Sequence, residues 1–165
     1  MLRAAFALAA ALFLAACGGG PKYADVAASL APVAPDKSRL VFLKESGFVG
    51  SLSSMRIQID GTTLGDVPNG TALLVDRAPG AVSISCDNAM SFGRWVVPVT
   101  LEPGKEYYFE IVHRGAALAA GMFGVVGLAA ESAAQPTQRD GPAELRPLGK
   151  DAALAKLQSL RLTRL

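Results

Sequence analysis

Apolar and polar residues alternate through the middle of the chain, and this pattern predicts β-strands. The stretches 55–59 and 95–101 place apolar residues at every second position, which is the period at which strand side chains point to opposite faces. The run 39–44 is short and apolar between charges, which predicts a buried strand. The stretch 106–114 carries large apolar residues on both faces and is predicted to be central. Pro98 cannot donate to a ladder, so 95–101 is predicted to lie at a sheet edge or to carry a bulge.

Turn residues separate these stretches at short intervals. They are Asp60-Gly61, Pro68-Asn69-Gly70, Pro79-Gly80 and Glu102-Pro103-Gly104-Lys105. Gly accepts positive φ and Pro fixes φ, so each group suits a turn. Three further short strands are predicted between the turns, at 62–67, 71–76 and 81–86. The pattern therefore predicts a mainly β fold, an antiparallel β-sandwich of about seven short strands, with a small barrel as the alternative.

The first sixteen residues have the pattern of an export signal. Met1-Leu2-Arg3 gives a positive start, and 4–14 is uninterrupted and apolar. This length suits the core of a signal peptide and is short for a membrane span. The apolar run ends in Leu14-Ala15-Ala16-Cys17, with small residues where a signal peptidase would cut. We therefore predict an N-terminal signal helix that ends at residue 16.

The tetrapeptide Leu14-Ala15-Ala16-Cys17 resembles a bacterial lipobox. The resemblance implies cleavage before Cys17, attachment of two acyl chains such as palmitate to its thiol, and acylation of the new amino group. Gly18 follows in place of Asp, which by the same resemblance implies the outer membrane, with the protein facing the periplasm. Each buried CH₂ of a lipid chain contributes about 0.8 kcal/mol, so several chains anchor firmly. An ordinary secretory signal with a chance Cys is the alternative.

The residues between Cys17 and the first strand suggest a tether. Gly18-Gly19-Gly20-Pro21 is followed by a segment rich in Ala and Pro, and such compositions favour flexible or loosely ordered chain. The lipidated Cys and a flexible tether are therefore predicted over 17–38, with a short helix at 23–30.

Four segments occur in a fixed order along the predicted domain at 39–114. They are Arg39-Leu-Val-Phe-Leu, Ile59-Asp-Gly-Thr-Thr-Leu-Gly-Asp-Val-Pro-Asn-Gly, Ala78-Pro-Gly and Leu101-Glu-Pro-Gly-Lys-Glu-Tyr-Tyr-Phe. Together they resemble a bacterial lipoprotein family described as domain of unknown function 2846, and they are similar to the PEGA-type sandwich modules of envelope proteins. The resemblance implies a sandwich and a location in the cell envelope. It brings no catalytic residues.

A Gly/Ala-rich apolar segment is predicted at 115–134. It carries no charge before Glu131, and Gly121, Gly124 and Gly127 recur at intervals of three. Small residues at such spacing let helices approach closely in membranes, although the stretch is shorter than the roughly 20 residues of a spanning helix. Three interpretations remain: packing on the sandwich, a second contact with the membrane or a membrane partner, and self-association.

The last part of the chain, 135–165, is predicted to be a linker and tail. Pro136 and Pro142 lie in a polar stretch. Asp151 is expected to cap a short helix whose apolar stripe consists of Ala153, Leu154, Leu157 and Leu160. An irregular or strand-like tail follows at 161–165.

Charge and cysteine content narrow the classes of function. The net charge of +2 is too small to indicate nucleic-acid binding. After lipidation only Cys86 remains, so an internal disulfide is excluded. Cys86 shares a predicted strand face with Val82 and Ile84 and is expected to be a buried small hydrophobe.

The sequence contains no catalytic, metal or cofactor pattern. His113 is the single His and is expected to be a surface or hydrogen-bonded residue at a strand end. A zinc spacing, a phosphate loop and a Gly-x-Ser-x-Gly motif are all absent from the sequence. Asp60, Asp66 and Asp76 suggest calcium ligands, but turns and strand ends explain them better.

The sequence therefore predicts a membrane-anchored envelope lipoprotein that is not an enzyme, whose sandwich contacts an unidentified envelope protein or polymer. A module that binds an envelope glycan or a small ligand is the alternative. Phe92 and its neighbouring loops would supply that surface, since packing explains Phe92 least. Trp95 is expected to pack in the core.

Overall fold

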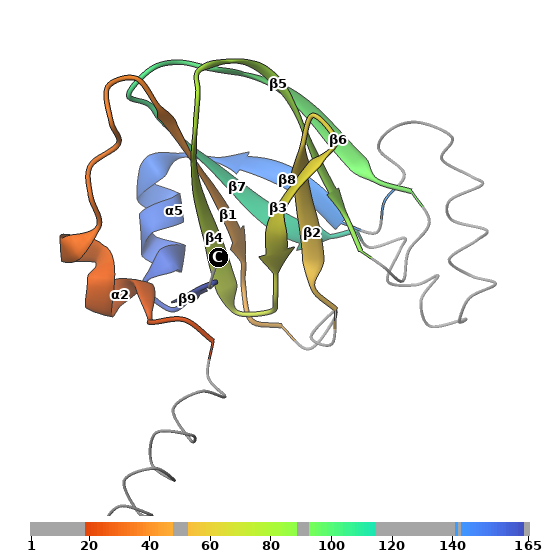
Figure 1. The fold of residues 1–165 in the computed structure, drawn as a ribbon. Helices are drawn as coiled ribbons and strands as arrows, with labels where there is room; N and C mark the ends of the chain where they lie inside the picture. Colours follow the sequence, from red (N-terminus) through yellow and green to blue (C-terminus); the bar gives the residue numbers. More distant parts are fainter. Residues whose placement is uncertain (1–18, 48–52, 89–92, 115–140, 142, 164–165) are drawn as a thin grey trace, which may run out of the picture.

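The computed structural model describes residues 19–47, 53–88, 93–114, 141 and 143–163, whose path is shown in Figure 1. Its strands are β1 (Ser38–Lys44), β2 (Met55–Ile59), β3 (Thr62–Val67), β4 (Thr71–Arg77), β5 (Gly80–Asp87), β6 (Trp95–Leu101), β7 (Glu106–His113), β8 (Ala143–Leu148) and β9 (Arg161–Leu162). Its helical segments are α2 (Tyr23–Val26), the 3₁₀ turn η2 (Ala27–Ser29) and α5 (Lys150–Leu157).

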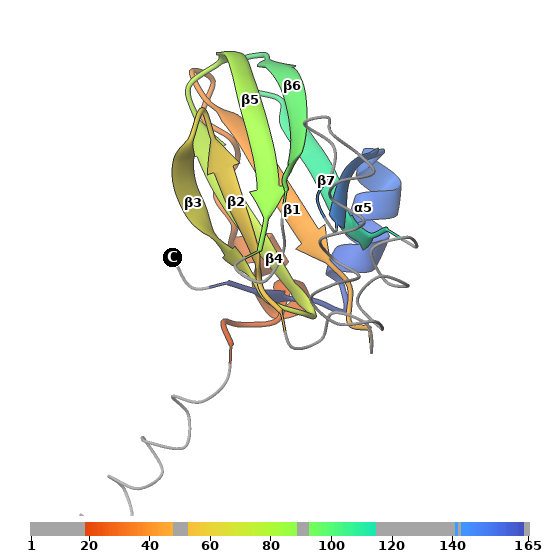
Figure 2. The same ribbon diagram turned by 90° about the vertical axis from the view of Figure 1, so that its right-hand side faces the viewer.

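The strands form two sheets that lie face to face (Figures 1 and 2). One sheet has the order β8-β7-β1-β4-β9 and the other β3-β2-β5-β6. The predicted mainly β sandwich is confirmed, and the seven strands expected over 39–114 correspond to β1 to β7. Two pairs in the five-stranded sheet are parallel, β1 with β7 and β4 with β9. Parallel pairs need long crossovers, so the alternation of residues alone did not predict them.

Strand register gathers five residues at one end of the five-stranded sheet. Lys44 pairs with Thr71, and Thr71 pairs with Arg161. Because β7 runs parallel to β1, its last residue His113 lies at this end as well, paired with Ala143. We call this the lower end, after its place in Figure 2. The upper end is the opposite one, where β1 and β7 begin.

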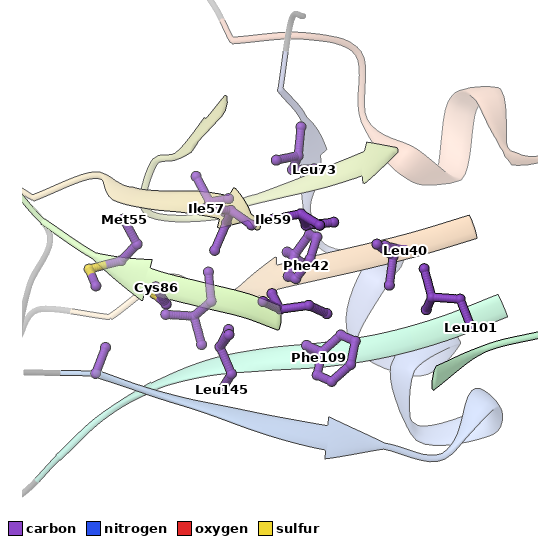
Figure 3. Packing of buried hydrophobic residues seen from close by; sticks show 14 residues of the cluster. Leu40, Phe42, Met55, Ile57, Ile59, Leu73, Cys86, Leu101, Phe109 and Leu145 are labelled. Atoms are coloured by element: carbon purple, nitrogen blue, oxygen red, sulfur yellow. The ribbon is translucent and has the colours of Figure 1, made fainter. Parts of the chain in front are cut away.

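A first hydrophobic cluster fills the space between the sheets (Figure 3). Phe42 and Phe109 stack at its centre with ring centroids 5.6 Å apart. The other members are aliphatic or sulfur-containing side chains of both sheets: Leu40, Met55, Ile57, Ile59, Val67, Leu73, Ile84, Cys86, Leu101, Ile111, Ala143 and Leu145. Burial of this apolar surface is the main force that holds the two sheets together.

A second cluster covers the outer face of the five-stranded sheet. Val41 and Leu43 alternate with the inward residues of β1 and pack against Ala153 and Leu157 of α5. The sheet is thus buried on both faces. This explains why 40–43 is apolar throughout, where a half-exposed strand would alternate.

The apolar stripe predicted for the C-terminal helix is confirmed. Ala153, Leu157 and Leu160 are buried, and Leu154 packs against the same cluster. The predicted cap is wrong, because α5 begins at Lys150 after Gly149 and has no side-chain cap hydrogen bond. Asp151 lies in the first turn instead, where a negative charge favours the helix N-terminus.

The chain from Ala143 onward belongs to the sandwich, so the prediction of a linker and tail over 135–165 is wrong for these residues. β8 pairs with β7 from His113↔Ala143 to Tyr108↔Leu148. Pro147 is tolerated because β8 lies at a sheet edge, where a missing N–H need not break a ladder. Pro98 lies in β6 at the edge of the other sheet, as predicted.

Candidate functional site

The residues that the sequence singles out for function lie outside the described part of the chain. They are Leu14, Ala15, Ala16, Cys17, Phe92, Gly121, Gly124 and Gly127. The same holds for the signal helix and for the whole Gly/Ala-rich segment 115–134. The predictions made for them stay predictions. The described residues instead provide two surfaces, one at each end of the sandwich.

The described chain begins beside β9 at the lower end. The amide of Leu162 donates to the carbonyl of Pro21 at 2.8 Å, and the amide of Tyr23 donates to the carbonyl of Leu160 at 2.9 Å. An antiparallel bridge between Lys22 and Arg161 lies between these two bonds. Residues 21–23 therefore extend the five-stranded sheet past β9.

Gly20 is the residue that makes this approach close. It is buried, and a Cβ built on it would overlap the carbonyl oxygen of Leu162. The guanidinium of Arg161 donates to the carbonyl of Gly20 at 3.0 Å. Gly20 thus serves close backbone contact, a role that only a residue without a side chain can fill.

The prediction of a flexible tether over 17–38 is wrong for the described residues from 19 onward. Tyr23 packs into the cluster under α5, and the guanidinium of Arg39 donates to the carbonyl of Ala31 at 2.9 Å. The short helix predicted at 23–30 is confirmed as α2 and η2. This segment runs from the lower end over the outer face of the sheet to the start of β1 (Figure 1).

Three ionisable side chains lie at the lower end between the sheets. Lys44 follows Phe42 on the inward face of β1, is 2% exposed, and donates to the carbonyl of Ser53. Cys86 of β5 is fully buried, as predicted. His113 follows Ile111 on β7, and its Nε2 is buried without a hydrogen-bond partner among the described residues, where the sequence suggested a surface or hydrogen-bonded side chain.

Burial governs the protonation of these groups. It lowers the pKa of Lys44, which the nearby Cys86 opposes, and it raises the pKa of Cys86 to about 12. Burial and then the charge of Lys44 lower the pKa of His113. A thiol that stays protonated at neutral pH is a poor nucleophile and a poor metal ligand. The three side chains therefore suit a structural role and not nucleophilic or metal chemistry.

Each aspartate that the sequence suggests as a calcium ligand has a structural partner. Asp60 has a φ of 50°, and its carboxylate accepts a hydrogen bond from the amide of Ser83 at 2.8 Å, which confirms the predicted turn. Asp76 accepts two hydrogen bonds from Arg39, and Asp66 lies 3.6 Å from Arg56. No group of three His, Cys, Asp or Glu that could hold a metal occurs in the described residues.

A cleft of about 590 Å³ opens at the upper end. Pro32 lies on one wall, Pro147 on another, and Lys105 and Tyr107 come from the turn and first residues of β7. Lys150 of α5 also lines the cleft. Tyr107 is partly exposed, and its hydroxyl accepts a hydrogen bond from the amide of Glu102 at 2.8 Å. The cleft combines apolar walls with two cationic side chains. The sequence suggests Tyr107 and Tyr108 as candidates for a sugar-stacking surface, but the meeting of three distant segments around them was not predicted.

Glu106 anchors one side of this cleft. Its Oε2 accepts hydrogen bonds from the hydroxyl of Tyr108 at 2.9 Å and from the ammonium of Lys150 at 2.6 Å. Burial opposes ionisation of Glu106, but these two bonds together with the charges of Lys150 and Arg39 outweigh it and lower its pKa. The carboxylate is therefore ionised and paired, which suits positioning of α5 rather than general acid catalysis.

Most described aromatic side chains are used in packing. Phe42 and Phe109 stack in the core, and Tyr108 is 6% exposed. Trp95 packs against the core as predicted, with the guanidinium of Arg114 5.6 Å from its ring centroid. Tyr107 of the cleft lining is partly exposed, but like Trp95 it packs against the first hydrophobic cluster. Its ring is thus only in part available for stacking on a ligand.

Comparison with known proteins finds no matching family model, no matching curated protein and no matching solved structure. The resemblance to the domain of unknown function 2846 family gains no support from these comparisons and stays a prediction. Within the described residues, none of the helices has the length and apolar character needed to cross a membrane.

Proposed function

We propose that this chain is a lipoprotein of the bacterial cell envelope, anchored through lipid on Cys17, and that its sandwich acts by binding and not by catalysis. The outer membrane, with the sandwich in the periplasm, is the proposed location. The observation that carries the proposal is the position of Leu14-Ala15-Ala16-Cys17, directly after an apolar run and three residues before Gly20. Cleavage before Cys17 would leave a lipidated residue next to the folded body.

The ionisable groups support a binding role. Lys44 and Cys86 are buried between the sheets, and His113 is half-buried with its Nε2 shielded from solvent. Glu106 is paired with Lys150. A catalytic base must reach the substrate, and its pKa must lie near the working pH. These groups have structural partners or are held away from solvent. The proposed partner is an envelope protein or polymer, with 115–134 and Phe92 as predicted interaction residues.

Lipid attachment is tested in bacterial cells that express the full chain. We expect radiolabelled palmitate to enter the wild-type protein and mass spectrometry to find the mature N-terminus at an acylated Cys17. Cys17→Ser should remove the label and retain the signal. Cys86→Ala is the matched control and should keep the label, because Cys86 is buried. Unlabelled wild type, or label lost equally in both variants, would contradict the proposal.

The upper cleft supports a second candidate, a module that binds a glycan or a small ligand. Its volume of about 590 Å³ lies in the range of small-molecule sites. Lys105 offers an exposed cation, whereas Lys150 is paired with Glu106. Tyr107 is partly exposed and also packs against the core. The sequence suggested the loops around Phe92 for such a surface, and Phe92 lies outside the described residues.

The second candidate is tested by calorimetric titration with an N-acetylglucosamine oligomer. If the cleft is the site, Lys105→Gln should weaken binding by about tenfold, the effect of losing one charged hydrogen bond. Lys37→Gln removes a charge outside the cleft lining and should leave binding unchanged. Absence of saturable binding to wild type, or equal effects of the two variants, would argue against a glycan site in the cleft.

A further inference from the structure

We infer that the lower end of the sandwich rests on the lipid surface and that the upper cleft points away from it. This inference rests on the proposed anchoring at Cys17. Its basis is the short chain between that residue and the folded body. Cys17 lies three positions before Gly20, with Gly18 and Gly19 between them. An extended chain spans at most about 3.6 Å per residue, so three steps reach roughly 10 Å. Gly20 itself is held at β9. Its backbone lies against the carbonyl of Leu162, and its carbonyl accepts a hydrogen bond from the guanidinium of Arg161.

The surface around Gly20 is stiff, because hydrogen bonds join its segments. The amide of Arg161 donates to the carbonyl of Gly70 at 3.1 Å. The side chain of Asn69 bonds both to the amide of Gly47 at 3.3 Å and to its carbonyl at 3.1 Å. We call the surface formed by residues 19–22, 45–47, 68–70 and 161 the lower face. A short anchor at one point of a stiff surface restricts the orientations that the whole body can take.

The charges of the lower face suit a lipid surface that carries anionic headgroups. Lys22 and Arg161 are exposed cations on it. Its carboxylate, Glu45, is paired with Lys156 of α5. Basic residues held close to a membrane surface are attracted to anionic lipids over about a Debye length. The lipid chains would hold the protein at the membrane, and these two cations would favour contact by the lower face.

The same orientation lifts the cleft away from the membrane. β7 begins at the cleft with Glu106 and ends at the lower end with His113. An eight-residue strand rises roughly 25 Å. The cleft would therefore open toward the compartment, where a soluble partner or ligand can reach it.

The test places a fluorescent probe at each end of the lipidated full-length protein in vesicles of phosphatidylethanolamine and phosphatidylglycerol with a headgroup-linked quencher. Ser46→Cys puts the probe on the lower face, and Ala78→Cys puts it in an exposed turn at the upper end. Cys86 is buried and stays unlabelled in the folded protein. We expect quenching at position 46 to exceed quenching at position 78 at least threefold.

A longer tether supplies the matched control. Insertion of ten Gly/Ser residues between Gly18 and Gly19 should reduce quenching at position 46 at least threefold while the protein still floats with the vesicles. Unchanged quenching in this variant, or equal quenching at positions 46 and 78 in the parent, would overturn the inference. So would a probe at position 46 that is shielded from a water-soluble quencher and also from the lipid quencher, since a second copy or another protein would then cover the lower face.

Failure of the anchor gives a different result from failure of the orientation. Without acylation at Cys17 the protein would not float with vesicles, and mass spectrometry would find an unmodified residue. That outcome removes the proposed function and this inference together. An acylated protein that floats but shows no difference between the two ends removes only the orientation.

Discussion

Gly20 and Leu162 approach so closely that the carbonyl oxygen of Leu162 occupies the space where a Cβ on Gly20 would lie. Gly20→Ala should therefore push the N-terminal segment off β9. We expect a loss of about 1–3 kcal/mol in the free energy of unfolding, the usual cost of forcing atoms into a packed site. Urea unfolding measures the loss. Hydrogen exchange should show faster exchange at the amide of Leu162, which donates to Pro21.

Gly19→Ala is the matched control, since a Cβ there meets the side chain of Arg161 at 3.8 Å, an ordinary contact. It should change the free energy of unfolding by less than about 0.5 kcal/mol. Equal effects at the two glycines would mean that residues 19–23 are not docked on β9.

α5 belongs to the fold, so truncating its buried face should destabilise the whole sandwich. Leu157 is 1% exposed, and Leu157→Ala should cost about 3 kcal/mol. Leu154→Ala makes the same change in helix propensity at a partly exposed position and should cost about 1 kcal/mol. The measurement is denaturant unfolding followed by the fluorescence of Trp95 on the opposite sheet. A Leu157→Ala variant with an unchanged Trp95 transition would show that α5 is an appendage.

Local pattern predicted β1 to β7 because turns and alternation are encoded within a few residues. The turn at Asp60 illustrates this, since the Asp60 and Gly61 backbones both have positive φ, as their residue types favour. The sequence pattern did not predict β8, because the residues around it are polar and it contains Pro147. A strand with Pro is recognisable only when its place at a sheet edge is known.

The N-terminal segment shows a different limit of sequence reasoning. Gly20 belongs to a run of three glycines, a composition that is typical of flexible chain and equally suited to close backbone approach. Its partner Leu162 is more than a hundred residues away in the sequence, so composition alone could not distinguish the two roles. The sequence did not predict the upper cleft either, because Pro32, Lys105 and Pro147 come together only in the fold.

The Arg39–Asp76 pair should contribute more to stability than other described pairs on the sheets. Arg39 and Asp76 are register partners on β1 and β4, and the guanidinium makes two hydrogen bonds to the carboxylate at 2.7 and 2.8 Å. A double-mutant cycle with Arg39→Lys and Asp76→Asn should give a coupling of about 1 kcal/mol, because Lys cannot make the forked contact.

The pair of Arg56 and Asp66 supplies the comparison for that cycle. Its nitrogen and oxygen are 3.6 Å apart, and both side chains are more than 40% exposed. Such pairs contribute roughly 0–0.5 kcal/mol, so the Arg56→Lys and Asp66→Asn cycle should show little coupling. Coupling energies of the same size in the two cycles would contradict the special role of the bidentate geometry.

His113 should make the fold sensitive to mild acid. Burial, and then the charge of Lys44, lower its pKa below 6.5 in the folded protein. The unfolded chain therefore takes up the proton first as the pH falls. The contribution of neutral His113 is present above about pH 6.5 and is lost as the pH falls from there through the folded pKa.

The check is the free energy of unfolding of wild type and His113→Gln at pH 7.5 and pH 5. Gln has no charge to gain, so wild type should lose more stability between the two values than the variant. Carboxylates titrate in both proteins and cancel in the comparison. An equal loss in both would show that the folded protein protonates His113 as readily as the unfolded chain.

Cys86 should have the opposite effect at high pH. Its pKa is raised from 9.0 to about 12 by burial, with a smaller contribution from Asp87. Above pH 9 the unfolded chain loses the thiol proton first, so stability falls as the pH rises from about 9 toward 12. Each pH unit within this window costs about 1.4 kcal/mol. Cys86→Val keeps a buried apolar side chain and should remove this loss.

Lys44 must be separated from this effect, since its own pKa is lowered by burial. The unfolded chain then holds the Lys44 proton longer, so Lys44 adds stability as the pH rises through its folded pKa toward 10.5. We therefore compare wild type with Cys86→Val, and Lys44→Met with the double variant, by urea unfolding at pH 8 and pH 10. In both comparisons the protein that keeps Cys86 should lose more stability between pH 8 and pH 10. In the native protein at pH 8, a thiol reagent should label Cys86 only as fast as the fold opens. Fast labelling of the native protein, or equal losses with and without the thiol, would show that solvent reaches Cys86 between the sheets.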